Sequence, residues 1–212
     1  MLDVFAPSAR RAVIRAGMTA AGFGQPRLND RFLLLALAES EPLAHPVELD
    51  VTASRIRALI EARAPRRRDR ELLATLGIDL DEVRRRAVAA TLSDDPARWR
   101  LRRSPVRPLR VTLSGPATEI VLDEGGRKVI EVARWASRRG HRTMIEREDL
   151  LWGVLADGSS ESVRVLLRGG ANISRIWTDL RRWHRSGGRG LTKGGQSSPV
   201  SWSGWSAVPI FQ

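Results

Sequence analysis

Two stretches of the chain share one order of apolar and polar positions. Residues 7–38 predict a long helix with a face of alanine and valine, a polar turn, and a second helix that is apolar nearly all round. Residues 124–155 repeat this order, and a constant offset of 117 aligns the two stretches without a gap. Val13 then falls on Ile130, and Leu34 falls on Leu151. A repeat of this kind predicts two halves with the same fold.

A second match lies downstream in both copies. Residues 71–88 align with residues 164–181 at an offset of 93. Because the offset falls from 117 to 93, the first copy has about 24 additional residues, which we place within 41–70. Each copy is therefore predicted to have four helices, and the last two of the first copy would cover 69–76 and 80–92.

The inserted residues 41–70 begin with a loop between Pro42 and Pro46. Thr52 is a candidate N-cap for a short helix over 53–62, whose apolar stripe is Ile56, Leu59 and Ile60. We expect the insertion to protrude from the first half.

Residues 94–118 read as a linker between the two copies. Their prolines exclude a long helix, and six arginines without any acid lie between Arg98 and Arg110. Two interpretations stay open: a solvated linker, or a contact with an acidic partner or nucleic acid. The alternation of Leu109, Val111 and Leu113 allows a short extended segment. The candidate contact residues are Arg98, Arg100, Arg102 and Arg103.

The predicted organisation is thus a first repeat over 1–93, the linker, a second repeat over 119–185, and a tail over 186–212. The tail is rich in glycine and serine, so we expect it to be disordered. Its Trp202 and Trp205 would dock either on a partner or on the domain, and the composition does not decide between them. Trp152 and Trp177 lie in predicted helices and are expected in the core.

Composition narrows the class of protein. The chain has no cysteine, which excludes disulfides, thiolate metal sites and a cysteine nucleophile, and suits the cytoplasm. No apolar run is long enough to span a membrane, and we expect no membrane partner. The net charge of +12 favours acidic partners or nucleic acid, although an excess of arginine over lysine is also typical of GC-rich bacterial genomes.

The sequence has no recognisable catalytic motif. Its histidines, His45, His141 and His184, fall in separate predicted elements, and Lys193 lies in a glycine-rich stretch with the wrong spacing for a phosphate-binding loop. We therefore expect a protein that is not an enzyme and needs no cofactor.

Several short motifs stand out. They lie at the start of the first copy, across its third and fourth helices, and around the second helix of the second copy. The residues are Phe5, Ala9, Arg10 and Val13; Leu73 to Arg84; Gly140 and His141; and Glu148 to Leu155.

These motifs, in this order, resemble the N-terminal domain of the bacterial ClpA and ClpC unfoldases, which is also called the double Clp repeat. The resemblance implies an all-α fold of two pseudo-symmetric four-helix repeats packed as one domain, here with an insertion in the first repeat. It further implies a stand-alone module, without the family's ATPase, that binds substrates, adaptors or Clp protease components in protein quality control. A basic helical protein that binds nucleic acid is the alternative.

The resemblance also implies a ligand site. ClpC relatives bind phosphorylated arginine through a glutamate near the start of the second helix of each repeat, and a carboxylate pairs well with a guanidinium group. Glu148, with Asp149 beside it, holds this place in the second copy, whereas the first copy has Arg31 with Asp30 adjacent. The competing interpretation of Glu148 is a solvated residue in the first turn of a helix.

Overall fold

The computed structural model of the chain describes residues 2–25, 27–62, 98–103, 111–115 and 119–187. The helices expected over 69–76 and 80–92, and all but the first two residues of the tail, lie outside these ranges. The division into repeats, linker and tail stays a prediction.

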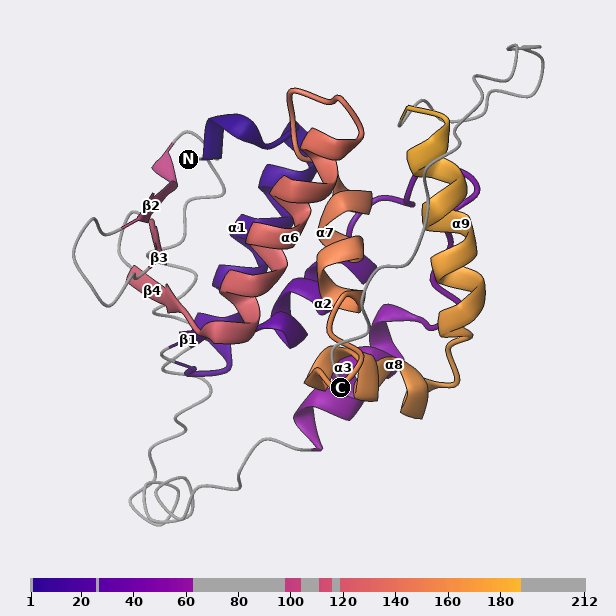
Figure 1. Cartoon of the computed structure of the whole chain (residues 1–212). Helices are drawn as coiled ribbons and strands as arrows, with labels where there is room; N and C mark the ends of the chain where they lie inside the picture. Colours follow the sequence, from indigo (N-terminus) through magenta and orange to yellow (C-terminus); the bar gives the residue numbers. More distant parts are fainter. Residues whose placement is uncertain (1, 26, 63–97, 104–110, 116–118, 188–212) are drawn as a thin grey trace, which may run out of the picture.

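The internal repeat is present in the four central helices. Helix α1 (Pro7–Gly22) and helix α6 (Glu124–Arg139) each have 16 residues, and helix α2 (Asp30–Ala38) and helix α7 (Arg147–Leu155) each have 9. Both bounds of each pair differ by the offset of 117 found in the sequence. Figure 1 shows α1, α6, α7 and α2 gathered at the centre of the molecule, where α6 packs on α7 and α1 packs on α2.

The chain segments before these helices pair across the two halves. Phe5, just before α1, forms a parallel bridge with Ile145, which lies just before α7. Leu122 before α6 is paired in parallel with Leu28 before α2. The two bridges are related by the same offset of 117. The halves are therefore joined through equivalent positions, as a pseudo-twofold arrangement requires.

The all-α expectation is wrong in one respect, because the described residues contain a four-stranded mixed sheet in the order β1-β4-β3-β2. Strands β2 and β3 are antiparallel, as are β3 and β4, whereas β1 is parallel to β4. The strands are β1 (Arg27–Leu28), β2 (Arg100–Arg103), β3 (Val111–Ser114) and β4 (Glu119–Leu122).

Strands β2 and β3 come from the predicted linker, so a plain solvated linker is also wrong for these residues. Leu101, Leu113 and Ile120 lie side by side on adjacent strands and are buried. They form the apolar face that period-two alternation produces. This face packs on α1, where a Cβ atom added at Gly17 would overlap the Leu113 side chain. The alternation at Val111 and Leu113 did predict an extended segment, and that prediction is confirmed.

Helix α3 (Ala53–Glu61) is the short helix expected in the insertion. Thr52 caps it, because its hydroxyl oxygen accepts the Arg55 N–H at 3.3 Å. The expectation that this segment protrudes is wrong. Ile56 and Ile60 are buried, and α3 packs against both α2 and helix α8 (Glu161–Gly169). An apolar stripe one turn long gains free energy only when another surface covers it.

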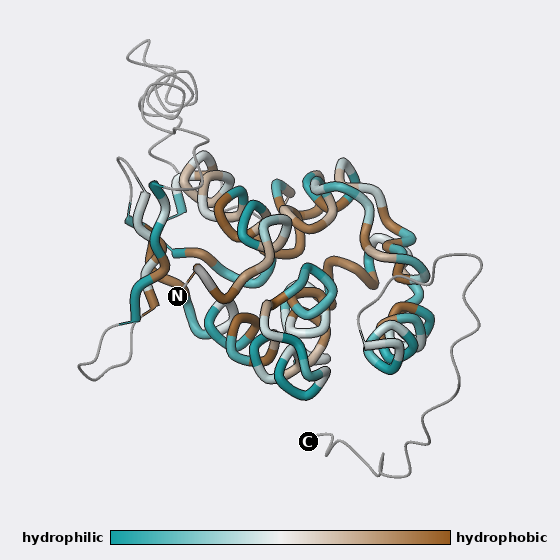
Figure 2. Tube along the Cα trace, turned by 90° about the horizontal axis from the view of Figure 1, so that it is seen from above, coloured by the Kyte–Doolittle hydropathy of each residue, from teal (hydrophilic) through white to brown (hydrophobic). Residues whose placement is uncertain are grey.

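A short 3-10 helix, η1 (Leu2–Val4), precedes α1. Helix α9 (Ile173–Arg185) packs on α7 and α8. Trp152 on α7 is buried, as predicted, and meets the half-buried Trp177 of α9 edge to face at 4.7 Å. Figure 2 shows the hydrophobic segments where helices face one another and the hydrophilic turns outside. In the described part of the chain no helix is both long and apolar enough to cross a bilayer.

Candidate functional site

The start of α7 carries both residues of the predicted ligand site, Glu148 and Asp149. Asp149 lies at the centre of a cluster of polar side chains. The Asp149 side chain is fully buried. One carboxylate oxygen accepts the Glu146 backbone N–H at 2.9 Å, which forms part of a capping box. Asp149 therefore helps to hold the first turn of α7 in place.

The other carboxylate oxygen of Asp149 faces two side chains from different elements. Arg142, in the turn between α6 and α7, forms an ion pair with it, and His184 Nε2 of α9 lies 3.4 Å away. The Arg142 guanidinium also lies over the Trp183 ring, 4.4 Å from its centroid. This buried cluster links α7 to α9 and to the turn between α6 and α7.

Burial sets the ionisation of the cluster. Burial raises the pKa of Asp149 to about 6, against the opposite effect of the Arg142 charge and the Glu146 N–H. Burial lowers the pKa of His184 to about 3, and the nearby Arg142 charge lowers it further in the same direction. His184 is therefore a neutral side chain near pH 7.

His184→Gln should make the stability less sensitive to acid. In the parent, the unfolded chain takes up a proton on His184 below about pH 6.5, whereas the folded chain does so only near pH 3. The contribution of His184 therefore lowers the free energy of unfolding as the pH decreases through that window, by up to about 1.4 kcal/mol per pH unit. The opposite effect of Asp149 is present in both proteins.

Urea unfolding of parent and variant, measured from about pH 7 down to about pH 4, tests this. The difference in stability should move in favour of the variant as the pH falls. Parallel pH profiles would contradict a buried neutral histidine.

Glu148 is not the solvated residue of the competing interpretation. It is only 4% exposed, and its Oε1 accepts the Ala44 backbone N–H at 2.6 Å. The adjacent Arg147 donates to the carbonyl oxygens of Glu41 and Pro42, the latter at 2.7 Å. Residues 41–44 therefore cover the first turn of α7, and a guanidinium ligand at Glu148 would have to displace them.

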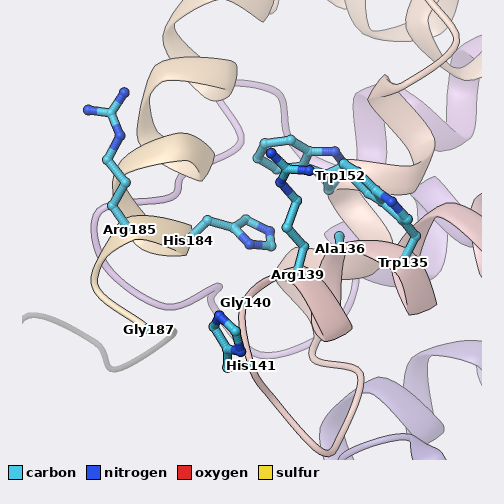
Figure 3. A pocket seen from close by; sticks show the side chains of 9 residues that line it. All are labelled: Trp135, Ala136, Arg139, Gly140, His141, Trp152, His184, Arg185 and Gly187. Atoms are coloured by element: carbon cyan, nitrogen blue, oxygen red, sulfur yellow. The ribbon is translucent and has the colours of Figure 1, made fainter. Parts of the chain in front are cut away.

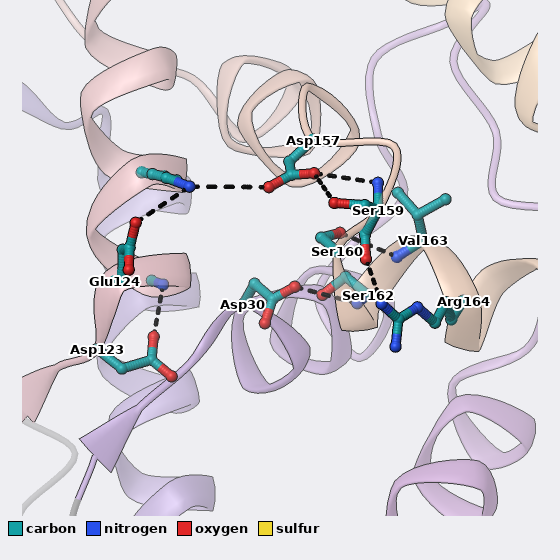
Figure 4. Close-up of polar contacts among 11 residues, drawn as sticks. Asp30, Asp123, Glu124, Asp157, Ser159, Ser160, Ser162, Val163 and Arg164 are labelled. Atoms are coloured by element: carbon teal, nitrogen blue, oxygen red, sulfur yellow. Dashed lines mark hydrogen bonds and ion pairs between the residues drawn. The ribbon is translucent and has the colours of Figure 1, made fainter. Parts of the chain in front are cut away.

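The start of α2 makes the corresponding contact to the other half. Asp30 is buried, and its carboxylate accepts the Ser162 backbone N–H at 3.0 Å in the first turn of α8 (Figure 4). A carboxylate is well placed at a helix N-terminus, where N–H groups are otherwise unpaired. Each leucine-rich helix thus binds, through its first turn, a segment of the opposite half. Sequence reasoning missed these cross-links, although Asp30 stood beside the predicted motif position.

The arginines of the predicted acidic-partner contact lie along one edge of the sheet. Strand β2 is one of the two edge strands of the sheet, and it carries Arg100, Arg102 and Arg103, while Arg98 comes just before it. The strand register places Arg100 opposite Ser114 and Arg102 opposite Thr112. All four arginine side chains are exposed. Their role in binding stays a prediction.

A pocket of about 210 Å³ lies beside the Asp149 cluster, between the end of α6, the middle of α7 and the end of α9 (Figure 3). Sequence reasoning missed it. The sequence feature that could have indicated the pocket is Trp135, a large aromatic residue off the apolar face of α6, which is 48% exposed. The lining residues are Trp135, Ala136, Arg139, Gly140, His141, Trp152, His184, Arg185 and Gly187.

Comparison with known proteins supports the fold but no family assignment. No family model matches the chain, and no curated protein matches it. Among solved structures, a match is the N-terminal domain of the caseinolytic protease associated chaperone ClpD from Arabidopsis thaliana. The TM-score is 0.54 at 18% identity, over 86% of this chain and 98% of that one. The chain therefore has a fold like that of a Clp N-terminal domain, as its motifs predicted.

Proposed function

We propose that this chain is a protein-binding module of a Clp-type chaperone system, which binds substrates, adaptors or the unfoldase itself in the cytoplasm. The observation that carries the proposal is the fold likeness, which extends over nearly the whole of the solved ClpD N-terminal domain. A pocket with an exposed tryptophan and an arginine-rich sheet edge supply surfaces that a protein partner could contact. The expectation that the protein is not an enzyme stays part of this proposal.

The proposal is tested with the purified full chain. Immobilised chain should retain Clp-type unfoldase components, adaptors or degradation substrates from the native cell, and each captured protein should bind again when purified. Degradation of a model substrate by the purified Clp machinery should change when the chain is added. If no purified component binds the chain again and the degradation rate is unchanged, the proposal is refuted.

We infer that phosphoarginine or a basic peptide end would bind in the second half near Glu148, in place of the Ala44 N–H, rather than in the first half. The first half has Arg31 at the equivalent position, and like charges about 4 Å apart repel by roughly 4 kcal/mol at an effective dielectric near 20. Calorimetric titration should show a heat of binding that Glu148→Gln abolishes. Equal binding by the parent and Glu148→Gln would show that this carboxylate does not hold the ligand.

Nucleic acid is a second candidate partner, favoured by the exposed arginines of β2 and the net charge of +12. Affinity for a short DNA duplex should then fall steeply with salt, and replacing Arg100, Arg102 and Arg103 by serine should reduce that slope. Replacing Arg55, Arg138 and Arg168 by serine is the matched control, because it also removes three exposed arginines. DNA affinity that is equal in both variants would point away from the sheet edge.

A further inference from the structure

The pocket beside the Asp149 cluster has an aromatic wall and the volume for one aromatic side chain. Trp135 of α6 and Trp152 of α7 contribute indole rings, and the ring of His184 meets that of Trp152 with centroids 4.5 Å apart. An apolar cavity of about 150 Å³ in another protein is large enough to bind benzene. The volume of about 210 Å³ here therefore suits one ring together with part of its backbone.

The charges around this pocket are positive. Arg139 and Arg185 line it from the last turns of α6 and α9, and no acidic residue is among the lining side chains. Arg139 lies over the Trp135 ring, 5.3 Å from its centroid. Figure 3 shows the pocket between these two helix ends, with His184 directed toward Trp152.

A third guanidinium lies behind the pocket wall. A Cβ atom added at Gly140, a lining residue, would overlap Arg142 Nη1. Arg142 is largely buried, and its Nε and Nη1 atoms have no hydrogen-bond acceptor among the described residues. Asp149 is the ion-pair partner of Arg142, whereas Arg139 and Arg185 are the charged residues that line the pocket itself.

We propose that this pocket binds an aromatic side chain of a partner protein, presented in a segment with acidic residues on both sides. The inference rests on the proposed protein-binding function and names a site and a ligand chemistry for it. The ring packs against Trp135 and Trp152, and the flanking carboxylates pair with Arg139 and Arg185.

Two other occupants fit the pocket less well. Tryptophan-lined pockets also bind organic cations, but a cation here would approach two guanidinium groups of the same charge. The chain's own residues 188–212 follow directly after the lining residue Gly187 and contain Trp202 and Trp205. That segment has Arg189 and Lys193 but no acidic residue, so it lacks the charge that the arginines select.

The experiment is a binding titration of the full chain with a fluorescent, end-capped peptide that has one phenylalanine between two pairs of acidic residues. Replacing the phenylalanine by alanine, or the acids by their amides, should each weaken binding about tenfold or more. Trp135→Ala should weaken it about tenfold, and Arg185→Gln about fivefold. Leu167→Ala and Arg168→Gln on α8 are the matched controls, since both side chains are exposed and outside the pocket, and they should leave affinity unchanged.

The outcomes separate this proposal from the broader function. Unchanged peptide affinity in Trp135→Ala and Arg185→Gln, or equal affinity for the amide peptide, overturns the pocket assignment. A synthetic peptide of residues 196–212 that competes as well as the acidic peptide overturns it in favour of the chain's own tail. If the pocket variants still retain the purified Clp partner as the parent does, the pocket proposal fails while the protein-binding function stands.

Discussion

Replacing Gly153 by alanine should lower the free energy of unfolding by about 2–3 kcal/mol, although alanine is the better helix former. Gly153 lies in the middle of α7, where that helix crosses α6. An added Cβ atom would overlap the Val129 carbonyl oxygen and lie 3.0 Å from the carbonyl carbon. Backbone atoms cannot rotate away as a flexible side chain can, so the two helices would have to separate.

Gly22→Ala is the matched control for this substitution. Gly22 ends α1, has no atom within 4 Å of an added Cβ, and does not have a positive φ. Alanine there should leave stability unchanged or raise it by up to about 0.5 kcal/mol. The midpoint of thermal unfolding should therefore fall by roughly 5–10 °C in Gly153→Ala but not in Gly22→Ala. Equal midpoints would mean that α6 and α7 are not in close contact at this point.

Asp149→Asn should destabilise the fold at least as much as Gly153→Ala, with an expected loss of about 3 kcal/mol or more in the free energy of unfolding. The substitution leaves Arg142 without its counter-charge, at a side-chain exposure of only 11%. An unpaired buried charge is among the most destabilising changes that one substitution can produce. The asparagine amide oxygen can still accept the Glu146 N–H, so the loss would come mainly from the charge. Asp149→Ala should cost about 1 kcal/mol more, because it also removes the cap.

A double-substitution cycle checks the origin of this loss. Arg142→Leu introduced into Asp149→Asn should restore part of the stability, because the buried charge disappears. Glu124→Gln removes an exposed partner of Lys128 on α6 and should change stability by less than about 0.5 kcal/mol. Urea unfolding of Asp149→Asn, Arg142→Leu, the double variant and Glu124→Gln measures these differences. Additive effects of Arg142→Leu and Asp149→Asn would show that the two side chains do not depend on each other.

Local properties of the sequence were enough to predict the paired helices. Helix periodicity depends on residues three and four apart, so the sequence showed the same helix order in both copies. In the structure, the bounds of α1 and α6, and those of α2 and α7, differ by the predicted offset of 117. The Thr52 cap was predictable for the same reason, since its acceptor oxygen and the Arg55 N–H are only three residues apart. The motifs around these helices also predicted the fold that the ClpD comparison supports.

The contacts at the predicted ligand site could be foreseen only in part. The motif identified Glu148 and Asp149 at the start of α7, but not the partners that already occupy them. Ala44 is 104 positions away from Glu148 along the chain, and His184 comes from the last described helix. The pocket was missed because its lining residues come from three helices and a turn, which no single periodic pattern connects.

By itself, the sequence determined that the two copies carry equivalent pairs of helices and which of their faces are apolar. Only the tertiary structure decided what covers those faces. Val111 and Leu113 alternate in the chain, but it is pairing with β4 and packing on α1 that build a sheet from a stretch resembling a linker. Ile56 and Ile60 form a stripe, but their burial depends on α2 and α8, elements that the stripe itself does not specify. The physical reason is that periodicity reports local geometry, whereas burial and ion pairing depend on residues that become neighbours only when the chain folds.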